Sequence, residues 1–139
     1  ARDIYDVYNM VKHRLFTKNE EMTLLRKAVV FYLTVGSSRK DYDTPTEYTA
    51  FSQIDKIRFP QIRSQLLPVL RRSEQFDFEK AKTEVKDFLV KLLLLTDSEK
   101  EYVNEFNDKK YMPELLFENK EIVDRIKFHP MALWKTRSR

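Results

Sequence analysis

Residues 76–106 read FDFEKAKTEVKDFLVKLLLLTDSEKEYVNEF and contain the pattern that decides the fold. In the first half of this stretch, apolar residues recur at steps of three and four, which predicts one buried face of an α-helix. These residues are Phe78, Ala81, Val85, Phe88, Leu89, Leu92 and Leu95. Asp77 stands where a helix-capping side chain is expected. Thr96 and Glu99 have the spacing of a capping box, so a second helix should follow, with Tyr102, Val103 and Phe106 inside.

The N-terminal third predicts two more helices. In Ala1–Phe16, one face is apolar and another carries polar side chains. The apolar face consists of Ile4, Tyr8, Val11 and Leu15, and the other face of Asp3, Asp6, Met10 and His13. Thr17 is expected to cap the next helix, which continues to Gly36. Its inner residues should be Met22, Leu25, Val29 and Tyr32. A strand is the competing prediction for Ala28–Val35, which is almost entirely apolar.

The remaining segments also have helical spacing, with interruptions. Ser37–Asp43 is expected to be a loop before a helix that starts at Thr44 with Pro45 at its first position. Beyond Asn107, we predict a short turn at Met112–Phe117, a helix at Glu121–Phe128 and a last apolar turn at Met131–Trp134. His129 is expected to interact with helix-terminal carbonyls, and Trp134 to anchor the terminal segment to the core.

Composition agrees with a helical fold. The 139 residues include one glycine, whereas sheet-rich folds need several at their turns. We therefore predict an all-α fold, a single compact domain of about six to eight helices over residues 1–139. The chain has no cysteine, no signal peptide and no apolar run that could span a bilayer, which favours the cytoplasm and no membrane partner. A net charge of +4 permits nucleic-acid contact without arguing for it.

Two sets of residues resemble a known family. The first is the N-terminal ARDIYDVY, residues 1–8. The second is spread over the C-terminal third as LTDSEKEY, MPELLF and HPMALWK, residues 95–102, 112–117 and 129–135. In this order and spacing they resemble the C-terminal part of the AbiEii-type nucleotidyltransferases, the toxins of bacterial toxin–antitoxin and abortive-infection systems. The resemblance covers essentially the whole chain and is strongest at its two ends.

The resemblance implies a role within a larger enzyme. In the family, a Gly-Ser or Gly-Gly turn, an Asp-x-Asp pair and a lysine motif precede the segment that Arg-Asp-x-Tyr-Asp matches here. This chain lacks all three, so we expect a fragment that is inactive alone and needs the missing N-terminal catalytic domain. The intact parent is expected to use Mg²⁺ and a nucleoside triphosphate, to modify an RNA or nucleotide acceptor, and to be countered by an antitoxin protein. No cofactor or metal is expected in this fragment.

The resemblance also names candidate site residues. Asp3 matches the carboxylate of the family motif, and Asp6 lies one helical turn further on, so both are catalytic candidates. Arg2 and Tyr5 match the motif's surroundings and are candidates for substrate binding. The two histidines, His13 and His129, have no metal-ligand spacing. The alternatives are helix-dipole charges without a catalytic role, a non-catalytic helical protein–protein interaction module, and a stand-alone nucleic-acid binder.

Overall fold

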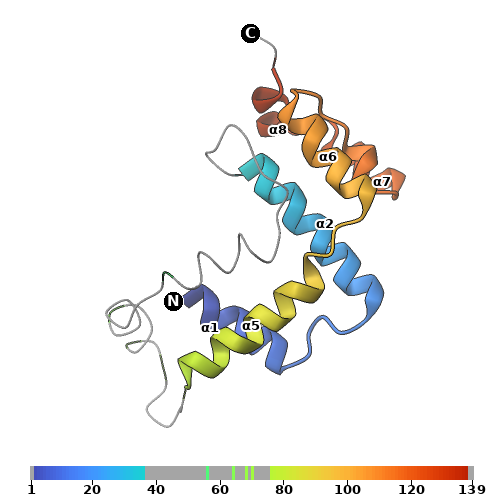
Figure 1. Cartoon of the computed structure of the whole chain (residues 1–139). Coiled ribbons are helices and arrows are strands. Elements are labelled where there is room, and N and C mark those ends of the chain that lie inside the picture. Colours follow the sequence, from blue (N-terminus) through green and yellow to red (C-terminus); the bar gives the residue numbers. More distant parts are fainter. Residues whose placement is uncertain are drawn as a thin grey trace. The chain divides into compact units, whose positions relative to one another are not determined.

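The computed structural model describes residues 2–36, 56, 64, 68, 70 and 76–137. Within these residues every regular element is helical, which confirms the predicted all-α fold (Figure 1). The elements are α1 (Arg2–Lys12), α2 (Asn19–Gly36), α5 (Phe78–Leu92), α6 (Asp97–Asn107), the 3₁₀ helix η3 (Pro113–Leu115), α7 (Lys120–Ile126) and α8 (Pro130–Lys135). The predicted loop at Ser37–Asp43 and the predicted helix start at Thr44 lie outside the described residues.

The chain groups into two compact units that are each discontinuous in sequence. The first unit combines Ala1–Asn19 with Thr46–Leu93, and the second combines Glu20–Pro45 with Leu94–Arg139. Helices α1 and α5 therefore belong to the first unit, and the helices from α2 and from α6 onward to the second. The prediction of one domain over residues 1–139 stays a prediction.

The predicted helix starts around residues 77 and 96 are confirmed. The backbone N–H of Lys80 donates to the Asp77 carboxylate over 3.2 Å, so Asp77 caps α5. At α6, the Glu99 N–H donates to the Thr96 hydroxyl over 3.2 Å, and the Thr96 N–H donates to the Glu99 carboxylate over 3.0 Å. These two bonds satisfy backbone donors that a helix start otherwise leaves free, and they complete the capping box.

In the first unit, α1 packs on α5. Ile4, Ala81 and Val85 form its buried centre, and a ring of partly buried apolar side chains surrounds them. This ring consists of Val7, Tyr8, Phe76, Phe78 and Leu89. Ala81 is fully buried, and its small side chain lets the α1 backbone come close to α5.

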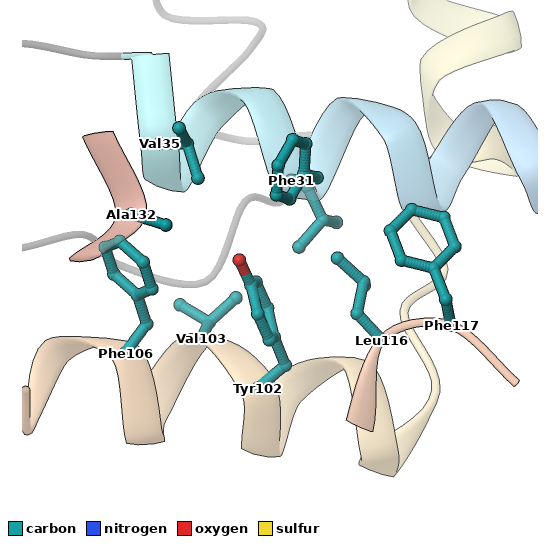
Figure 2. Packing of buried hydrophobic residues seen from close by; sticks show 9 residues of the cluster. Phe31, Val35, Tyr102, Val103, Phe106, Leu116, Phe117 and Ala132 are labelled. Atoms are coloured by element: carbon teal, nitrogen blue, oxygen red, sulfur yellow. The ribbon is translucent and has the colours of Figure 1, made fainter. Parts of the chain in front are cut away.

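In the second unit, α2 and α6 face each other across the core, with η3 and α8 at its sides (Figure 2). Nine buried residues fill this core. They are Val30, Phe31, Val35, Tyr102, Val103, Phe106, Leu116, Phe117 and Ala132. Ile122, Val123 and Ile126 of α7 pack against it, as the apolar spacing of that helix predicts.

Two expectations about the N-terminal helices are wrong. The first helix ends at Lys12 rather than Phe16, and Leu15 is exposed. The Leu15 N–H donates to the Met10 carbonyl and the Arg14 N–H to the Val11 carbonyl, with Arg14 at a φ of 53°. This pattern is a Schellman motif, which stops a helix and usually has glycine at the left-handed position.

The buried face of α2 is also shifted in phase from the prediction. Tyr32, expected inside, is exposed, whereas Val30, Phe31, Thr34 and Val35 are buried. The helix begins at Asn19, two residues after the expected cap Thr17, and extends to Gly36. Since Ala28–Val35 lies within α2, the competing prediction of a strand is excluded.

Candidate functional site

The candidate catalytic residues lie on α1, whose other side is fixed to α5. Ile4 is buried against Ala81 and Val85, and Val7 lies one turn further along the same face. Because α1 has only 11 residues, it would be marginal as an isolated helix and depends on this apolar contact. The contact therefore determines which side of α1 remains available for chemistry.

Aromatic rings add a second contact between α1 and the start of α5. The Tyr5 ring meets the Phe76 ring edge to face at 5.2 Å between centroids, and the Tyr8 ring meets the same Phe76 at 5.6 Å. Such edge-to-face geometry is the favourable one for aromatic quadrupoles. Tyr5, a candidate substrate-binding residue, is consequently half-buried and held in orientation by packing.

Asp6 is the candidate catalytic residue whose side chain the structure describes, and it is exposed. It lies two residues beyond the buried Ile4, which on a helix places it on a different side. Asp3 and Arg2 belong to the first turn of α1, and their side chains lie outside the described part of the structure. A carboxylate held on the open side of an anchored helix can orient an ammonium group or a hydroxyl.

A second polar arrangement, which the sequence did not reveal, lies in the other unit. Glu99 is fully buried, and both of its carboxylate oxygens contact Nε of Arg26, at 2.7 and 3.1 Å. The same carboxylate accepts from the Thr96 N–H in the capping box. Glu99 therefore has two tasks at once: it caps α6, and it forms an ion pair that ties α6 to α2.

Two lysines and a threonine extend the polar contacts of α2. Lys27 Nζ donates to the Leu116 carbonyl over 2.6 Å, and Lys135 Nζ donates to the Thr34 carbonyl over 3.0 Å. The hydroxyls of Thr34 and Tyr102 are hydrogen bonded at 3.0 Å inside the core. Each contact satisfies a group that packing would otherwise leave without a partner, so these residues have a structural role.

Burial perturbs two tyrosines of this unit. Desolvation raises the pKa of Tyr102 to about 12, although the hydrogen bond from the Thr34 side chain lowers it in part. Burial also raises the pKa of Tyr111 well above its ordinary value, with smaller contributions from Tyr102 and Glu114. Both phenols thus stay protonated at neutral pH and do not act as bases.

The C-terminal residues differ from expectation in two ways. Trp134 was expected to anchor the end of the chain, but 66% of it is exposed, and the small Ala132 is the residue of α8 that enters the core. His129 was expected to interact with helix-terminal carbonyls. Instead its ring meets Phe31 edge to face at 5.6 Å, and its buried Nδ1 has no hydrogen-bond partner.

Comparisons with protein families, with curated proteins and with solved structures returned no match to this chain. Among the described residues, no three His, Asp or Glu side chains are grouped as a metal site would require. None of the described helices has the length and apolar character needed to cross a membrane.

Proposed function

We propose that this chain is the helical C-terminal part of a nucleotidyltransferase similar to the AbiEii-type toxins. In this proposal α1 supplies Asp3 and Asp6 to a cleft whose other wall is an N-terminal catalytic domain. That domain would hold the nucleoside triphosphate and Mg²⁺, while an RNA or nucleotide acceptor would approach along α1. The resemblance in ARDIYDVY, PELL and HPMALWK supports the assignment of class.

The observation that carries the proposal is the placement of Asp6. It is exposed on a helix whose opposite face is fixed by Ile4 and by the Tyr5 and Tyr8 contacts to Phe76. Pre-positioned carboxylates on rigid elements suit the orientation of a reacting hydroxyl or of a lysine. In the intact enzyme, attack of the acceptor hydroxyl on the triphosphate would release pyrophosphate, and an aspartate on α1 would orient the attacking group.

The test uses the full-length product of the gene that encodes this chain, with radiolabelled nucleoside triphosphates and RNA. Asp3→Asn and Asp6→Asn should each reduce nucleotide transfer by about 100-fold or more, the range expected for a positioned acid–base group. Asp87→Asn, on an exposed position of α5, is the matched control and should retain full transfer. Equal transfer by all three variants would refute the proposal. A coding sequence without an upstream Asp-x-Asp pair would refute it too.

A non-catalytic helical protein–protein interaction module is the second candidate. It is favoured by the large apolar side chains that α8 exposes, among them Trp134. On this alternative, the full-length gene product would transfer no nucleotide, and changes at Asp3 and Asp6 would have no phenotype. The same transfer assay therefore separates the two candidates.

A further inference from the structure

The second unit presents an apolar surface that neither candidate function has used. Three large side chains of α8 are exposed: Trp134 at 66%, Met131 at 44% and Leu133 at 44%. We call these three residues the α8 face. Single exposed apolar residues are common, but three within four positions of one helix form a continuous patch.

Helical geometry places the three side chains on one arc. Successive residues of a helix are rotated by about 100°, so Trp134 lies almost opposite Ala132, with Leu133 and Met131 to either side. Ala132 is fully buried in the core that it shares with Val35 and Phe106. The inner side of α8 is therefore fixed, and the α8 face must point away from the core of its own unit.

The charges around the α8 face are of one sign. From Arg125 to the end of the chain there is no acidic residue, whereas Lys127, Lys135, Arg137 and Arg139 follow in the same stretch. The chain segments that share a core with Ala132 add no net negative charge. Residues 28–36 contain no charged side chain, and residues 105–110 balance two acids with two lysines.

We propose that the α8 face is a docking surface for an acidic, amphipathic segment of another protein. The apolar side of such a segment would cover Trp134, Met131 and Leu133, and its carboxylates would meet the cations beside them. Tryptophan is over-represented among the residues that dominate binding, and methionine adapts to partners of different shape. The proposal does not depend on nucleotide transfer, because it concerns another unit of the chain than α1.

Aliphatic side chains favour a protein partner over a nucleic acid. Met131 and Leu133 flank the indole, whereas single-stranded nucleic acids bind to aromatic platforms on which successive bases stack. Lys127 already pairs with Asp124 at 3.8 Å, and Lys135 is engaged with the Thr34 carbonyl. These contacts reduce the positive charge available for a row of phosphates, and a few carboxylates need less.

The experiment uses the whole chain and a displayed library of 16-residue peptides. Apolar residues occupy helical positions i, i+3, i+4 and i+7 of each peptide, and aspartate or glutamate fills the rest. A second library with lysine or arginine at those positions is the charge control. We expect the acidic library to yield binders and the basic library to yield none. No enrichment from the acidic library, or equal enrichment from both, would overturn the proposal.

Selected peptides are then labelled and titrated by fluorescence anisotropy. Trp134→Ala should weaken binding on the order of 30-fold, the loss typical of a tryptophan hot spot, and Leu133→Ala should weaken it by a smaller factor. Leu24→Ala removes a leucine of similar exposure from α2 and should leave binding unchanged. Circular dichroism checks that each variant keeps its helix content. Binding that tolerates Trp134→Ala would overturn the proposal.

Trp134 is the chain's one tryptophan, so its own emission reports on the α8 face. A blue shift on adding a selected acidic peptide would support burial of the indole by that peptide. Self-association that Trp134→Ala abolishes would instead assign the α8 face to a second copy of this chain. Quenching by an oligonucleotide, with no response to the acidic peptide, would assign it to nucleic acid.

Discussion

Replacing Glu99 by alanine should strongly destabilise the second unit. The change removes both contacts to Arg26 Nε and the capping bond from the Thr96 N–H. Glu99 is fully buried and the Arg26 side chain is only 13% exposed, so the arginine cannot regain full hydration. Removing one partner of a buried ion pair typically costs about 3–5 kcal/mol. We expect a loss of free energy of unfolding in that range for Glu99→Ala.

A double-mutant cycle separates the ion pair from the other effects of the change. Arg26→Met alone should also be costly, because it leaves a buried carboxylate without its counter-charge. The double variant Arg26→Met, Glu99→Met replaces both charges by apolar side chains of similar length. It should therefore lie within about 2 kcal/mol of the wild type, the remainder being the uncapped Thr96 N–H.

Urea unfolding followed by far-UV circular dichroism measures these free energies. Arg125→Met is the matched control, because Arg125 pairs with Glu121 at 2.9 Å while both side chains are more than 70% exposed. That exposed pair should contribute less than about 0.5 kcal/mol. The reasoning fails if Glu99→Ala costs less than about 1 kcal/mol, or if the two single changes simply add in the double variant.

Three further predictions concern one contact each. Because burial raises the pKa of Tyr102 to about 12, folding disfavours its phenolate, and stability should fall between pH 10 and pH 12. Tyr102→Phe should make the loss in that range smaller by roughly 2–3 kcal/mol, whereas Tyr32→Phe at an exposed position should not change the profile. Ile4→Ala should cost about 2–4 kcal/mol in thermal or urea unfolding, since Ile4 is buried against α5. Asn119→Ala should cost about 1 kcal/mol by the same measurement, because the Asn119 side chain accepts from the N–H groups of Glu121 and Ile122; no loss would contradict its role as the cap of α7.

The parts of the fold that depend on near neighbours in sequence could be predicted. Asp77 as a cap, and Thr96 with Glu99 as a capping box, require only side chains and backbone within one helical turn. The same holds for the inner positions of α6, where the apolar period is unambiguous. The position of Asp6 away from the buried face of α1 followed from spacing in the same way.

Contacts between distant segments could not be predicted. Nothing local to Glu99 indicates that Arg26, 73 positions earlier in the chain, is its partner, so the carboxylate looked like an ordinary capping residue. The end of α1 was missed because Arg14, not glycine, takes the left-handed conformation there. Tyr32 was misplaced because Ala28–Leu33 is apolar on every side, which leaves the phase of the helix undefined.

Side-chain size was also misleading at the C-terminus. Trp134 was assigned to the core because large aromatic side chains usually contribute most to burial. In a helix of six residues, however, only one narrow side can face inward, and the close approach of α8 to Val35 and Phe106 requires the small Ala132 there. This packing choice depends on the three-dimensional partners of α8, which are more than 20 positions away.

The interleaved order of the two units affects how the chain can fold during its synthesis. Helix α2 leaves the ribosome early, but its partner α6 follows only after the 73 residues that separate Arg26 from Glu99. At roughly 5–20 residues per second, α2 would wait several seconds with its apolar side uncovered. The first unit meets the same delay, because α1 precedes α5 by a similar length of chain. We therefore expect that neither half of the gene, expressed separately, yields a folded unit.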